Sequence, residues 1–131
     1  MLKSIEEFRK YVLVTGFRGV RIEDAGGFLK LINKEKPSDV EVQVFDAEGV
    51  ATWEHLYFAV LDALTAFKNM ANISKSLAME TMLYASAQRQ IRKATGILGV
   101  KPSSTKMAMV IMGERPEDLK SVLSKISRHV K

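Results

Sequence analysis

The sequence contains no cysteine, only three prolines, and just two histidines among its 131 residues. The absence of cysteine excludes a disulfide scaffold and a thiolate metal site, and it is typical of a reducing compartment. No two histidines have the spacing of zinc ligands. The longest apolar runs are far shorter than the roughly 20 residues that span a bilayer. Because the first residues are charged, we expect no secretory signal and a cytoplasmic location.

Most catalytic signatures are missing as well. The sequence has no nucleophile elbow, Walker loop or dinucleotide fingerprint. Its nearest approach to a phosphate loop is Gly16-Phe17-Arg18-Gly19, and two glycines at that spacing usually mark only a turn. Asp46 and Glu48 could be an acid/base pair, but acidic residues before a helix more often favour its dipole. The seven methionines fall at core spacings, so we expect no metal and no cofactor.

What the sequence does contain is typical of one globular domain over residues 1–131. Hydrophobic residues make up 47% and charged residues 27%, which is enough apolar surface for a single core. The formal charge is +5. This mild basic bias favours an anionic partner without choosing among RNA, an acidic protein and a membrane surface.

Hydrophobic periodicity predicts the element order β-α-β-α-α-α-β-α. The fold class is therefore α/β (or α+β), a small mixed sheet of about three strands packed with a layer of about five helices. The run at 106–112 is continuously apolar, which favours an interior strand covered on both faces. A capping-box pattern at Ser4–Glu7 adds a short helix. The predicted strands cover 11–17, 40–44 and 106–112, and the predicted helices 4–10, 24–33, 53–67, 74–85, 87–98 and 116–130.

The segment 86–93 is the most informative part of the chain. Its two glutamine amides suit the edge of an adenine, and its basic side chains suit phosphates. Its serine could cap a helix whose free N–H groups also attract phosphate. A solvated basic helix face is the competing interpretation. The candidate RNA contacts in this segment are Ser86, Gln88, Arg89, Gln90, Arg92 and Lys93.

His55 has several possible roles. It lies in the first turn of the most apolar predicted helix, two residues after Trp53. It could hydrogen-bond a neighbouring backbone group, or make a polar contact at the rim of an RNA-binding groove. It could also be the general base of a small stand-alone enzyme, with Glu54, Asp46 or Glu80 as its partner.

Three stretches of the chain resemble a known family. They are DAEGVATWEHLYFAVLDAL at 46–64, NISKSLAMETMLYASAQRQIRKATGILGV at 72–100 and KMAMVIM at 106–112. Together with VTGFRGVRI at 14–22, they are similar to the kinase-binding subunit of the KEOPS complex, archaeal type. The most specific piece is Ala85-Ser86-x-Gln88-x-Gln90-Ile91, followed by Gly99 and a strand. The resemblance covers about 12–112.

The resemblance implies a noncatalytic regulatory subunit. KEOPS attaches a threonylcarbamoyl group to the adenosine beside the anticodon of transfer RNA, and another subunit performs the transfer. The subunit resembled here binds the small atypical kinase/ATPase and, in archaeal relatives, the 3′ CCA end of transfer RNA. With the CCA end as the ligand, the candidate RNA contacts are His55 together with the residues already named in the segment 86–93. Contact with the remaining KEOPS subunits is expected only indirectly. The expected kinase contacts are Ile97, Leu98 and Val100.

Two departures from the family pattern affect these expectations. The common Ser-Gly-Gln is Ser86-Ala87-Gln88 here, which argues against a positive φ at position 87. Only one helix follows the last predicted strand, whereas several relatives continue further. The partner contacts that such an extension makes elsewhere are therefore not assumed for this chain.

Overall fold

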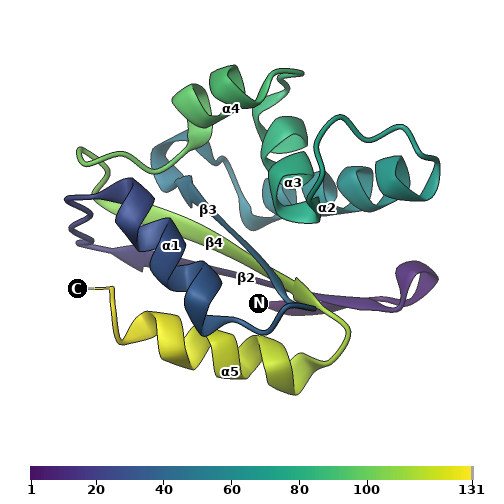
Figure 1. The fold of residues 1–131 in the computed structure, drawn as a ribbon, viewed down its shortest axis with the longest axis horizontal. Coiled ribbons are helices and arrows are strands. Elements are labelled where there is room, and N and C mark those ends of the chain that lie inside the picture. Colours follow the sequence, from purple (N-terminus) through teal and green to yellow (C-terminus); the bar gives the residue numbers. More distant parts are fainter. Residues whose placement is uncertain (131) are drawn as a thin grey trace.

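The computed structural model describes residues 1–130, in which a four-stranded sheet lies between two layers of helices (Figure 1). The α/β class predicted from the sequence is confirmed. No helix within these residues has the length and apolar character that crossing a membrane requires. The elements are β1 Leu2–Ile5, η1 Glu6–Phe8, β2 Lys10–Arg18, α1 Ala25–Glu35, β3 Glu41–Asp46, η2 Ala47–Gly49, α2 Trp53–Lys68, α3 Leu77–Ser86, α4 Ile91–Leu98, β4 Lys106–Gly113 and α5 Pro116–Ser127.

The sheet has the strand order β1-β2-β4-β3, and every pairing is antiparallel. It therefore has one strand more than predicted and is not mixed. Strand β4 lies between β2 and β3 and is buried from Met107 to Gly113, as its continuous apolar run predicted. Ala108 and Val110 point into the core under α2–α4, whereas Met109 and Ile111 point into the core under α1 and α5.

The helices cover both faces of the sheet rather than forming one layer. Figure 1 shows α2, α3 and α4 on one side of the sheet and α1 with α5 on the other. This division follows from β4, because a strand that is apolar on both faces needs two covers. Helix α2 lies centrally in the first cover, with Leu56, Val60 and Ala63 fully buried.

The predicted helix at 4–10 is wrong. Residues Leu2–Ile5 form an edge strand that pairs with β2, and only Glu6–Phe8 form a single 3-10 turn. No side-chain cap precedes that turn, so the capping-box pattern is not used. Pairing with the sheet buries Ile5, and this tertiary gain outweighs a weak local helix signal.

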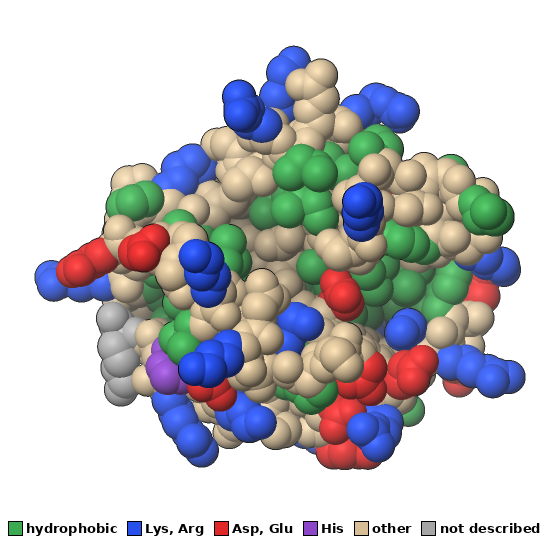
Figure 2. Space-filling model, in the orientation of Figure 1, with side chains coloured by type: hydrophobic (Ala, Val, Ile, Leu, Met, Phe, Trp, Pro, Cys, Tyr) green, Lys and Arg blue, Asp and Glu red, His purple; other side chains and the backbone are tan. Residues whose placement is uncertain are grey.

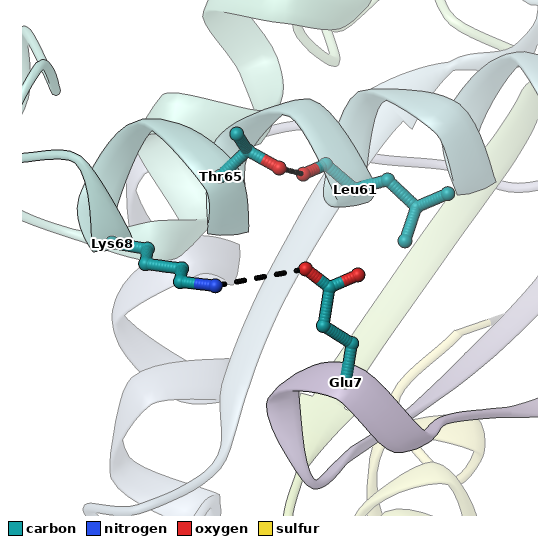
Figure 3. A network of polar contacts seen from close by, with 4 residues as sticks. All are labelled: Glu7, Leu61, Thr65 and Lys68. Carbon is teal, nitrogen blue, oxygen red and sulfur yellow. Dashed lines mark hydrogen bonds and ion pairs between the residues drawn. The ribbon is translucent and has the colours of Figure 1, made fainter.

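The turn η1 lies close to the end of α2 (Figure 3). Lys68 Nζ lies 3.7 Å from Glu7 Oε2, and Thr65 Oγ1 donates a hydrogen bond to the Leu61 carbonyl at 2.9 Å. Both members of the ion pair are largely exposed, so it contributes little to stability. The contact nevertheless places β1 and η1 beside the helical layer that carries the candidate site.

Candidate protein and nucleic-acid interface

Helix α3 ends in a Schellman turn that directs the chain into α4. The backbone N–H of Gln88 donates to the Leu83 carbonyl at 3.0 Å, and that of Ala87 donates to the Tyr84 carbonyl at 3.2 Å. Ala87 has a φ of 57°, in the left-handed region. The expectation that position 87 would not need a positive φ is therefore wrong, because this hydrogen-bond pattern requires it.

Ser86 does not cap the following helix, contrary to the prediction. It is the last residue of α3, and its Oγ donates to the Leu83 carbonyl at 3.2 Å. Helix α4 begins only at Ile91, with Gln90 at the N-cap position and no side-chain cap. The free N–H groups of α4 therefore lie beside Gln90 rather than beside Ser86.

The remaining segment side chains lie at the surface. Gln88 is half-buried, whereas the other four are exposed. No ion pair within residues 1–130 involves the three basic ones, which leaves their charges available to an anionic ligand. The exposed residues are Arg89, Gln90, Arg92 and Lys93.

A small pocket of about 170 Å³ adjoins this segment. Its wall includes Glu80, which is only 1% exposed. The Glu80 carboxylate accepts hydrogen bonds from the backbone N–H groups of Ile73 and Ser74 and, at 2.6 Å, from the Ser74 hydroxyl. With its oxygens occupied, Glu80 anchors the loop before α3 rather than serving as a free base. The pocket is lined by Ile73, Glu80, Leu83, Tyr84, Ala87, Gln88 and Arg89.

The His55 ring joins the first turn of α2 to the end of α3. Its Nε2 lies 2.8 Å from the Ala85 carbonyl oxygen, and its Nδ1 accepts from the Ala51 backbone N–H at 3.4 Å. This pattern places the proton on Nε2. Both ring nitrogens are bonded to backbone groups rather than to any of the three proposed carboxylates. The geometry favours the structural role and leaves no free lone pair for a general base.

The three residues predicted to contact the kinase have different environments. Ile97 is 56% exposed, whereas Leu98 is 2% exposed and belongs to the core under α2–α4. Leu98 is thus a core residue, contrary to the prediction. Val100 is half-buried against the opposite core. Of the three, Ile97 is the most exposed and therefore the most accessible to a partner.

Sequence reasoning missed several exposed apolar residues on the α2–α4 layer. Phe58, on α2, is 58% exposed, and Tyr84, on α3, is 44% exposed. Figure 2 shows hydrophobic side chains over α3, with Lys and Arg side chains over α4 and the neighbouring loop. The near-continuous apolar sequence of α2 was the available signal, because one helix cannot bury every side. The large exposed apolar residues of this layer and its connecting loop are Trp53, Phe58, Met70, Ile73, Tyr84, Ile91 and Ile97.

The net charge of the chain is concentrated near this layer. Residues 81–113 contain five basic residues and no Asp or Glu, which leaves fifteen basic and fifteen acidic residues elsewhere. A stretch of 33 residues thus carries the entire +5. It includes α4, the loop after it and β4. No group of three or more potential metal ligands lies within residues 1–130.

Comparison with known proteins agrees with this picture. The family model described as kinase binding protein CGI-121 matches residues 17–131. The regulatory protein Cgi121 of Methanocaldococcus jannaschii is 34% identical over 90 residues, which are 69% of this chain and 53% of the relative. The chain thus spans about half the length of that relative. These matches confirm the resemblance seen in the sequence: the chain belongs to the CGI-121 family of kinase-binding proteins.

Proposed function

We propose that the chain is a noncatalytic regulatory subunit of a KEOPS complex. In this role it binds the atypical kinase/ATPase subunit and the 3′ CCA end of transfer RNA, and supports threonylcarbamoyl transfer to the adenosine beside the anticodon. The observation that carries the proposal is the α2–α4 layer, which combines exposed apolar side chains with basic side chains that have no ion-pair partner within residues 1–130.

The part of the proposal that concerns kinase binding (the kinase arm) rests on the family of the chain and on its exposed apolar residues. Large exposed apolar side chains on one layer are typical of a protein interface. Ile97 and Tyr84 are the best candidates for anchors, because each is large and incompletely buried in the free subunit. The chain and the kinase, expressed together, should co-purify as a stable complex.

The part of the proposal that concerns transfer-RNA binding (the RNA arm) rests on the side chains of the segment 86–93 and on the positive charge of the residues around it. Arg89, Arg92 and Lys93 can pair with phosphates, while Gln88 and Gln90 can read base edges. Single-stranded ends expose both edges and faces of their bases, so an unpaired 3′ end suits these amides better than a duplex. The charge of residues 81–113 supports an anionic ligand on this side of the molecule.

The test of the RNA arm is a comparison of intact and trimmed transfer RNA. Removal of CCA should weaken binding much more than a change in the anticodon does. Equal affinity for both forms would contradict the RNA arm and leave the kinase arm standing. Turnover of a substrate by the isolated chain would contradict the noncatalytic assignment.

A further inference from the structure

Two basic residues face each other across the end of the sheet. Arg18, the last residue of β2, is the register partner of Lys106, the first residue of β4. Residues directly opposite in antiparallel strands project from the same face, and like charges in that position destabilise the pair of strands. Both side chains are exposed, and neither forms an ion pair within residues 1–130. The fold thus carries an electrostatic cost at this pair that no ion pair among residues 1–130 offsets.

An apolar groove adjoins this pair on the same face of the sheet. Gly16 and Ala108 are register partners two positions further along the two strands, or ~7 Å away. Both line a groove of about 320 Å³ whose rim includes Trp53. The groove is open because these two positions carry little or no side chain. Lys3 Nζ lies 5.7 Å from the centre of the Trp53 ring and adds a third cation.

Further basic residues lie on the two loops that continue from this pair. Arg21 lies on the loop after β2 and Lys101 on the loop before β4, and a hydrogen bond from the Val20 N–H to the Thr105 carbonyl at 3.0 Å joins these two loops. One acidic residue, Glu23, lies beside Arg21 in the hollow between these loops. A second acidic residue, Asp46 of β3, is the register partner of Met107 and accepts a hydrogen bond from Ser104 Oγ at 3.0 Å, so acidic as well as basic residues lie at this end of the sheet. Neither carboxylate forms an ion pair with Arg18 or Lys106 within residues 1–130.

We propose that Arg18, Lys106 and the groove beneath Trp53 form a second RNA-binding site, separate from the segment 86–93. Arg18 and Lys106 would pair with successive phosphates of a single strand, and one unstacked base would enter the groove against the indole. This inference rests on the proposed function, because the ligand is another stretch of the same RNA. A paired cation cluster beside an aromatic rim is the arrangement by which proteins hold single strands without reading their sequence.

The test uses the full chain with the double variant Arg18→Ala/Lys106→Ala. Its matched control is Lys30→Ala/Lys34→Ala, which removes the same charge from exposed positions of α1 on the opposite face. Binding of a whole transfer RNA transcript is titrated against salt. The double variant should lower the salt slope by about 1.4, which corresponds to binding roughly 10- to 30-fold weaker at 0.1 M salt. The control should bind within about twofold of the parent after allowance for net charge.

A second variant separates the ligand role from a structural one. Lys106→Glu replaces a like-charge pair by an opposite-charge pair, so the melting temperature should rise, by roughly 1–5 °C, while RNA binding falls. Gly16→Val should weaken RNA binding without changing the salt slope, because it fills the groove. A Cβ at Gly16 meets the Met107 carbonyl oxygen at an ordinary 3.5 Å, and circular dichroism controls for the effect of the two γ-methyl groups on folding.

The outcomes distinguish this inference from the proposed function. Failure of the parent chain to bind transfer RNA overturns both. Normal binding by the parent and by Arg18→Ala/Lys106→Ala overturns the second site alone. Loss of kinase co-purification with unchanged RNA binding would identify an acidic protein segment as the occupant, and this also overturns the RNA assignment.

Discussion

The His55 ring and the Ala85 carbonyl form the main polar link between the start of α2 and the end of α3, with Nε2 and O separated by 2.8 Å. The carbonyl of Ala85 belongs to the last turn of α3, where helix carbonyls lack partners within the helix. His55 therefore holds the Schellman turn, and with it the segment 86–93, against α2. If the segment 86–93 binds RNA as proposed, we expect His55 to affect that binding through the position of the segment rather than through direct contact.

Replacing His55 by Ala should lower the free energy of unfolding by about 1–2 kcal/mol, because it leaves the Ala85 carbonyl without its partner. Denaturant unfolding measures the decrease. His129→Ala is the control, since among residues 1–130 the one ion pair of its ring is with Glu35, at 3.6 Å. If His55 instead contacts RNA, His55→Ala will erase the preference for CCA at temperatures where the variant is fully folded.

Ala87 holds a conformation that suits glycine better. An L-residue in the left-handed region costs about 1–2 kcal/mol, which the greater flexibility of unfolded glycine only partly offsets. We therefore expect Ala87→Gly to raise the free energy of unfolding by about 0.5–1 kcal/mol. Ala94→Gly, within α4, should lower it by about 1 kcal/mol or more. A destabilised Ala87→Gly would show that the turn in solution does not have the left-handed geometry.

Sequence patterns predicted those features that depend on local composition. The apolar run of β4 predicted a strand covered on both faces, and Thr52 caps α2 by accepting from the His55 N–H at 3.4 Å. Strand β1 was not predicted, because its extended conformation depends on hydrogen bonding to β2. The positive φ of Ala87 was not predicted, because it results from hydrogen bonds at the end of α3 that composition does not reveal.

The assignment of Leu98 failed for a related reason. Its neighbour Ile97 has nearly the same hydrophobicity, and the packing of the Ala94–Leu98 face of α4 determines which of them faces the core. The prediction started that helix at 87, whereas it begins at Ile91. The exposure of Arg18 and Lys106 opposite each other depends on strand register, which no local pattern in the sequence specifies.

These two neighbours provide a test of the kinase arm. Ile97→Glu should abolish co-purification with the kinase while leaving circular dichroism unchanged, because Ile97 is exposed and a buried apolar anchor commonly contributes ~2 kcal/mol or more. Leu98→Ala should instead lower the free energy of unfolding by about 2–5 kcal/mol. Retained binding by a folded Ile97→Glu would exclude this residue from the interface.

The last prediction separates base reading from charge within the segment 86–93. Arg92→Ala and Lys93→Ala should weaken binding to every RNA end similarly, and each should lower the salt slope by about 0.7 because one phosphate is no longer neutralised. Gln88→Ala or Gln90→Ala should leave the slope nearly unchanged and erase the preference for CCA over CCU. One bidentate pair of hydrogen bonds to a base accounts for about 1–3 kcal/mol of such discrimination.

The structure indicates which of the two glutamines should contribute more to base discrimination. Gln88 is half-buried beside the pocket and its backbone N–H is fixed by Leu83, so its amide is better positioned to read a base than that of exposed Gln90. We therefore expect Gln88→Ala to reduce discrimination more than Gln90→Ala does. Circular dichroism at the binding temperature controls for folding. If all four variants bind CCA-ended RNA like the parent, the segment is a solvated helix face and the RNA contacts lie elsewhere on the chain.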